Sequence, residues 1–229
     1  VTLASLVVPI TEEMAKTEIP YGQSQAGGDR LRDCSGNFLR VSSAVANQCE
    51  DARPTLAASE GVVPWIPGGG SKNVFQGTYQ EWEEDGTPRA ARTTRGTARW
   101  YDKQGLFNPV YMDGSTPSKG LANLRRVIKP GMVIWFGRSG QSYTKGSGLD
   151  KLFKNGVGIV HMGVVHSVQR DEATGEVVSY KLYHGRRVIP GEFDNGITDH
   201  KWETTKGRPP FGNGRDPVVG WAPLLPEAN

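Results

Sequence analysis

Two runs of alternating residues separated by a polar turn restrict the fold more than any other part of this sequence. "GIVHMGVVHSVQ" and "GEVVSYKLYHG" flank "RDEATG", which is a pattern typical of a β-hairpin. "GMVIWFG" and "PVVGWAPL" predict one strand before the hairpin and one after it. Helical patterns come mostly earlier in the chain. Helices followed by an antiparallel sheet predict an α+β fold.

The strongest helical pattern starts at a cysteine. In "CSGNFLRVSSAVANQCEDA" a broad apolar stripe is formed by Phe38, Leu39, Val41, Val45 and Ala46. A short helix is predicted over 11–17 with Thr11 as its cap, and another over 119–128. From about residue 51 to 118 the sequence is mostly irregular. We therefore expect a single domain, 1–229, with a long loop-rich insertion at about 50–128.

Composition excludes several classes of protein. The net charge is +3, too small for a dedicated nucleic-acid binder. No apolar run approaches the roughly 18 residues of a membrane helix. The apolar N-terminus "VTLASLVVPI" lacks the cationic flank of a signal peptide. A chain that binds no nucleic acid and spans no membrane is expected.

The chain contains two cysteines, Cys34 and Cys49. A continuous helix between them would separate the thiols by ~22 Å, whereas bridged cysteines need Cα atoms within ~7 Å. Cys34 is therefore expected to be free. At a helix N-terminus the helix dipole and the backbone N–H groups favour a thiolate and lower its pKa. The alternative for a lone cysteine is a small buried hydrophobe, and taken alone Cys34 favours that alternative.

A thiol nucleophile needs a base, and that base usually needs an orienting group. His161 and His184 lie on the two hairpin strands. Two registers are consistent with the turn, one pairing His161 with His184 and the other pairing Gly163 with His184. In both registers the two imidazoles share a face, at roughly 5–8 Å between Cβ atoms. The pair would face the helix that carries Cys34, as base and orienter.

Other uses of these histidines are a satisfied core pair or a metal site. Neither a four-cysteine site nor an HExxH motif is present, so no metal is expected. His166 is predicted to point to the opposite face from His161 unless a bulge intervenes. His200 is placed in a polar loop. Both are interpreted as structural or solvated.

Short motifs in this order resemble the NlpC-type cell-wall peptidases, a papain-like family. They are "PYGQSQAGGDRLRDCSG", "PGMVIWFG", "HMGVV" and "LYHGRRV". The family's Asp-Cys-Ser-Gly motif, with a preceding Tyr and Gly-Gly, is matched by Tyr21, Gly27, Gly28, Asp33, Cys34, Ser35 and Gly36. The resemblance covers residues near 12–40 and 128–190.

The resemblance implies a papain-like fold with Cys34 as nucleophile, His161 as general base and His184 as its orienter. Tyr21 would lie near the oxyanion or the substrate. Asp33 and Ser35 would shape the pocket for the substrate's amino group and carboxylate, and Asp33 could equally cap the helix.

The family cuts amide bonds in peptidoglycan stem peptides, commonly between D-glutamate and a diamino acid, without a cofactor. Some relatives cut the muramoyl–alanine amide. The resemblance thus implies an extracytoplasmic enzyme, expected as a monomer. It is compatible with an antibacterial effector countered by an immunity or inhibitor protein, and with a fragment of a larger hydrolase. An acyltransferase and a catalytically silent wall-binding module remain alternatives.

Two weaker features lie in the insertion. Arg89, Arg92, Arg95 and Arg99 recur at helical spacing. We interpret them as a solvated face rather than a binding stripe. Trp65 and Trp82 could stack on sugars or belong to a core.

Overall fold

The computed structural model describes residues 2–17, 33–48, 80–82, 88–90, 93–103, 105–110, 117–141, 143, 148–189, 192–202 and 216–224. The helices are α1 (Leu3–Lys16), α2 (Cys34–Gln48), α4 (Thr94–Lys103), α5 (Pro117–Val127) and α6 (Gly148–Phe153). The strands are β1 (Gln80–Trp82), β2 (Pro88–Ala90), β3 (Asn108–Pro109), β4 (Met132–Gly137), β5 (Ile159–Arg170), β6 (Val177–Ile189), β7 (Glu192–Lys201) and β8 (Val218–Pro223).

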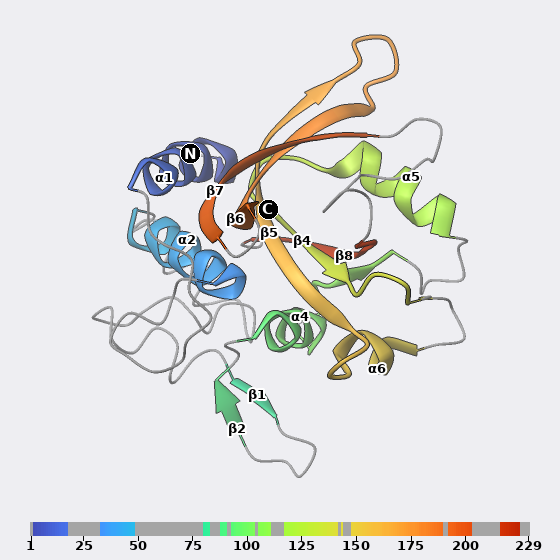
Figure 1. Ribbon diagram of the computed structural model, residues 1–229. Helices are drawn as coiled ribbons and strands as arrows, with labels where there is room; N and C mark the ends of the chain where they lie inside the picture. Colours follow the sequence, from blue (N-terminus) through green and yellow to red (C-terminus); the bar gives the residue numbers. More distant parts are fainter. Residues whose placement is uncertain are drawn as a thin grey trace.

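A six-stranded sheet in the order β3-β8-β4-β5-β6-β7 organises the fold, and its neighbouring strands pair antiparallel. Helices α1, α2 and α4 lie on one side of it and α5 lies on the other (Figure 1). The α+β class is therefore confirmed. No helix in the described part of the chain is long and apolar enough to cross a membrane.

The central strands are buried on both faces. Along β4, Val133 and Trp135 face the core shared with α1, α2 and α4. Ile134 and Phe136 face the core shared with α5. Because successive side chains of a strand point to opposite faces, one strand supplies both cores. This explains why "MVIWFG" is continuously apolar rather than alternating.

Helix α1 differs from the prediction. The sequence indicated a start at Thr11, but the helix begins at Leu3 and Thr2 is its N-cap in a capping box with Ser5. Thr11 is fully buried, and its Oγ1 donates to Val7 O over 2.7 Å. Pro9 lies inside the helix on its exposed side. Burial of the apolar face against the sheet outweighs the local cost of that proline.

Strand β7 was not predicted, and His200 lies on it rather than in a loop. The run "EFDNGITDHK" contains an Asn-Gly pair, which is a turn signal, and few apolar residues. The strand forms nonetheless because it pairs with β6 from Ser179–Lys201 to Ile189–Glu192. β7 is one of the two edge strands of the sheet, and a polar composition is tolerated at an edge.

The interval 50–128, predicted as loop-rich, contributes to the core. Tyr101 of α4 is fully buried, packs edge-on against Trp135 at 5.2 Å between ring centroids, and donates its hydroxyl to Leu224 O. Arg99 lies over the Phe153 ring at 5.6 Å. Trp82 lies on β1, while Trp65 and Arg92 fall outside the described residues. Helix α4 therefore packs into the hydrophobic core beside the six-stranded sheet.

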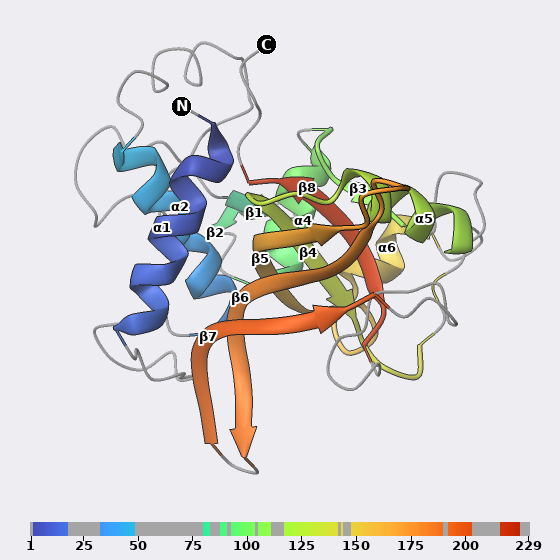
Figure 2. The same cartoon turned by 90° about the horizontal axis from the view of Figure 1, so that it is seen from above.

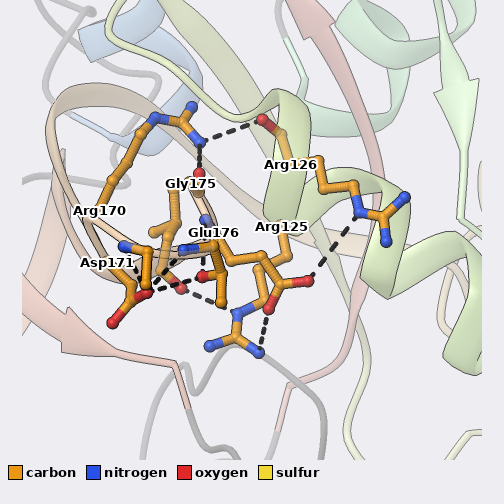
Figure 3. A network of polar contacts seen from close by, with 9 residues as sticks. Arg125, Arg126, Arg170, Asp171, Gly175 and Glu176 are labelled. Atoms are coloured by element: carbon orange, nitrogen blue, oxygen red, sulfur yellow. Dashed lines mark hydrogen bonds and ion pairs between the residues drawn. The ribbon is translucent and has the colours of Figure 1, made fainter.

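A polar network fastens α5 to the β5–β6 hairpin (Figure 3). Arg170 donates to the carbonyls of Gly175 at 2.7 Å, Arg126 at 3.1 Å and Ile128 at 2.6 Å. Glu176 forms an ion pair with Arg125 at 3.0 Å. These bonds hold the turn predicted from "RDEATG" against the end of the helix, which fixes the hairpin that carries His161, His166 and His184.

Candidate active site

Helix α2 begins at Cys34, and Asp33 caps it. Asp33 Oδ1 accepts from the Gly36 N–H at 2.8 Å and from the Ser35 hydroxyl at 3.2 Å. This is the geometry of an N-cap side chain bonded to the third residue of the helix. Ser35 is buried and turned toward Asp33. The cap fixes the first turn, and with it the position of the thiol.

The Cys34 sulfur lies at the edge of β5. The β5–β6 pairing runs from Val164–Tyr183 to Arg170–Val177. Beyond Tyr183, β6 continues with β7 alone, and Figure 2 shows these two strands bending away together. The sulfur accepts a hydrogen bond from the Met162 backbone N–H and further bonds from the N–H groups of Ser35 and Cys34 itself. The thiol is thus beside the residue that follows His161.

A buried amide pair fastens α2 to the bent strand. Asn37 Nδ2 donates to Asn195 Oδ1 of β7 over 2.7 Å, and both side chains are almost fully buried. Asn37 lies one turn after Cys34 on the helix. The bond therefore ties the segment that carries the thiol to the outermost strand.

Burial changes the expected ionisation of Cys34. The side chain is 8% exposed, and burial raises the pKa of the thiol to about 12, with the Asp33 carboxylate adding to the rise. The three backbone N–H groups act in the opposite direction but are outweighed. The prediction of a lowered thiol pKa is therefore wrong, because the helix N-terminus points into protein rather than toward water.

His161 and His184 share a face, as predicted. The His161 Nε2 to His184 Nδ1 distance is 3.0 Å. The pair Val164–Tyr183 places Gly163 opposite His184, so the second of the two expected registers is present and His161 lies on the diagonal. The parity that the sequence implied is retained because the two register shifts between the turn and the histidines, one on each strand, offset each other.

The shared face is not the one that packs on α2. The His161 ring lies 5.9 Å from the Phe136 ring, on the α5 side, whereas Cys34 belongs to the opposite core. Cys34 and His161 therefore lie on opposite faces of the sheet, and the residue that links them along β5 is Met162, which follows His161 and whose backbone N–H bonds the sulfur.

The surroundings of His161 favour its neutral form. Burial lowers the pKa of the His161 imidazole to about 3, and the electrostatic influence of the neighbouring His200 acts in the same direction. With Cys34 protonated and His161 neutral at pH 7, the resting pair is thiol and imidazole. A preformed thiolate–imidazolium pair is not favoured in this closed arrangement.

Two residues near the histidine pair were not predicted. Thr198 Oγ1 lies 2.6 Å from His184 Nε2 and 2.7 Å from His200 Nε2. Their spacing of two residues would place both side chains on one face of a strand. This spacing was not used because the segment was interpreted as a loop. His166 is set apart by contacts with α1, namely Thr11 Oγ1 at 2.8 Å and Glu12 at 3.7 Å. Tyr21 lies outside the described residues.

Among the residues that the structure describes, no group of three or more His, Cys, Asp or Glu side chains could hold a metal ion. Comparison with protein-family models, with curated proteins and with solved structures found no match to this chain. The chemistry proposed below therefore rests on the site itself and on the short motifs of the sequence.

Proposed function

We propose that this protein is a papain-like cysteine amidohydrolase that cleaves an amide bond in the stem peptide of bacterial peptidoglycan. The D-glutamyl to diamino acid bond is the expected target, and the site of action is outside the cytoplasm. The class of reaction comes from the side chains described above. The substrate comes from the resemblance of the Asp-Cys-Ser-Gly and His-x-Gly motifs to the NlpC-type family.

One observation carries the proposal. A free thiol at the start of a capped helix accepts the N–H of Met162, while the adjacent His161 hydrogen-bonds to a second histidine. Nucleophile, base and orienting group are the three parts that covalent acyl transfer requires. They come from α2, β5 and β6, so the proposal depends on the tertiary structure rather than on one local motif.

The mechanism starts from neutral partners. As Cys34 Sγ attacks the substrate carbonyl, its proton passes to His161, and the sulfur–carbon bond forms while the carbonyl becomes an oxyanion. Backbone N–H groups of the first turn of α2 lie beside the sulfur and would stabilise that negative charge. Collapse expels the amine, which takes the proton from His161. Water, deprotonated by His161, then hydrolyses the thioester and restores the thiol.

The test is digestion of purified peptidoglycan, with mass spectrometry of the soluble products. Wild-type protein should release fragments cut within the stem peptide, and Cys34→Ala and His161→Ala should release none. Cys49→Ala is the matched thiol control and should give the wild-type products. Intact muropeptides after wild-type digestion would refute the substrate, and unchanged products from Cys34→Ala would refute the nucleophile.

The products also separate the alternatives. Release of the whole stem peptide from muramic acid indicates a muramoyl–alanine amidase. Incorporation of an added amine at the new acyl end indicates a transferase. Binding of wall fragments without any cleavage indicates a catalytically silent module.

A further inference from the structure

A chain of polar side chains extends from His161 across three strands. His161 Nε2 lies 3.0 Å from His184 Nδ1, and His184 Nε2 lies 2.6 Å from Thr198 Oγ1. Thr198 Oγ1 lies 2.7 Å from His200 Nε2. β5, β6 and β7 each contribute to it. The far end is packed as well, because the His200 ring stacks on Tyr180 at 5.1 Å between centroids.

The threonine hydroxyl transmits proton position along this chain because it has a single proton. If the hydroxyl donates to His200, it must accept from a protonated His184 Nε2. Neutral His184 then offers a lone pair at Nδ1, so His161 donates its Nε2–H and carries a lone pair at Nδ1. If the hydroxyl instead donates to His184, every bond in the chain reverses. His161 Nε2 then accepts, and its proton sits on Nδ1.

A backbone carbonyl distinguishes these two arrangements. Gly185 O lies 2.7 Å from His184 Nδ1, and a carbonyl oxygen can only accept. It therefore favours a proton on His184 Nδ1, which is the reversed arrangement. The arrangement that leaves a lone pair on His161 Nδ1 requires the hydroxyl to donate to His200. Gly185 O and His200 therefore favour opposite tautomers of His184: the carbonyl favours a proton on Nδ1, and His200, as an acceptor from Thr198, favours a proton on Nε2.

We propose that Thr198 and His200 are positioning residues that set the tautomer of His161 through His184. Given the proposed function, they determine which ring nitrogen of the base can take the thiol proton. Neither residue has to touch the substrate. The coupling itself belongs to the folded protein and exists whether or not peptidoglycan is cleaved.

Histidine tautomers are read directly from side-chain ¹⁵N chemical shifts, which require no substrate. We would compare wild type with Thr198→Val, which keeps the shape and removes the hydroxyl, and Thr198→Ser, which restores it. His200→Phe keeps a ring for stacking on Tyr180 and removes the acceptor. Asp199→Asn is the matched control, because Asp199 is ion-paired to Lys181 at 3.7 Å and takes no part in the hydrogen-bond series from His161 to His200.

We expect Thr198→Val and His200→Phe to change the tautomer populations of both His161 and His184, with Thr198→Ser and Asp199→Asn close to wild type. In digestion assays, Thr198→Val should lower kcat at least about tenfold with little change in KM, since general base catalysis contributes about 10²–10⁴-fold. Unchanged His161 and His184 shifts in Thr198→Val would overturn the proposal. So would a Thr198→Ser variant as impaired as Thr198→Val.

The two readouts separate this inference from the proposed function. If the tautomers are coupled but peptidoglycan stays intact, the proposed substrate is refuted and the hydrogen-bond coupling is supported. If cleavage depends on Cys34 but the tautomers are uncoupled, the proposed enzyme is supported and the coupling is refuted.

Discussion

Alkylation of Cys34 as a function of pH tests the environment assigned to the thiol. A Cys49→Ser background leaves Cys34 as the one remaining thiol, because the chain has two cysteines. Burial raises the Cys34 pKa from 9.0 to about 12. At pH 8 the thiolate fraction then falls roughly a thousandfold relative to the unfolded chain. Higher basicity makes the remaining thiolate more nucleophilic by roughly 15–30-fold.

The net expectation is that iodoacetamide modifies the folded protein at least about 30-fold more slowly than the same protein in urea. Limited access to a thiol that is 8% exposed slows it further. The pH dependence separates access from ionisation. The rate for the folded protein should keep rising by about tenfold per pH unit from pH 8 to 10, while the unfolded rate levels off near the ordinary thiol pKa. A folded rate that is level from pH 6 to 9, or faster than the unfolded rate, would refute the neutral pair and indicate a preformed thiolate.

Two further predictions concern residues next to Cys34 and His161, namely Asp33 and Gly163. Gly163→Ala should lower the free energy of unfolding by about 1–3 kcal/mol in urea denaturation, because its Cβ would lie 2.6 Å from Cγ of the buried Leu182; a change below about 0.5 kcal/mol would contradict the packing described. Asp33→Asn keeps a capping side chain but removes the charge that raises the Cys34 pKa, so it should speed alkylation with little loss of stability, whereas Asp33→Ala should also cost about 0.5–2 kcal/mol. Equal stability of the two Asp33 variants would argue against the cap.

Much of the fold could be predicted because its strands are strongly patterned. β4, β5, β6 and β8 were all indicated by apolar runs or alternation, and the turn between β5 and β6 by its polar residues. β7 could not be predicted from its own composition, because its pairing with β6 provides its stability. α1 was predicted too short because Thr11 was interpreted as its cap; the helix extends back to Leu3 through Pro9, whose local cost is offset by packing that the assembled sheet provides.

The site was partly predictable for the same reason. Side-chain parity along two strands determined that His161 and His184 share a face, whichever register formed. The ionisation of Cys34 could not be inferred, because it depends on how deeply the helix N-terminus is buried. The contacts of Thr198 and His200 with His184 could not be foreseen, because β7 was not predicted. Features set by local sequence pattern, such as the shared face of His161 and His184, could be predicted. Features set by tertiary burial, such as the Cys34 pKa, could not.

The hydrogen bond between Asn37 and Asn195 links the helix that begins at Cys34 to the strand that carries Thr198 and His200. Asn37 is on the helix that starts with the thiol, and Asn195 is on the strand that carries Thr198. A movement that separates β7 from β6 would therefore also disturb the helix that begins at Cys34 and the contacts of Thr198 with His184 and His200. The integrity of the proposed site thus depends on an edge strand of the sheet.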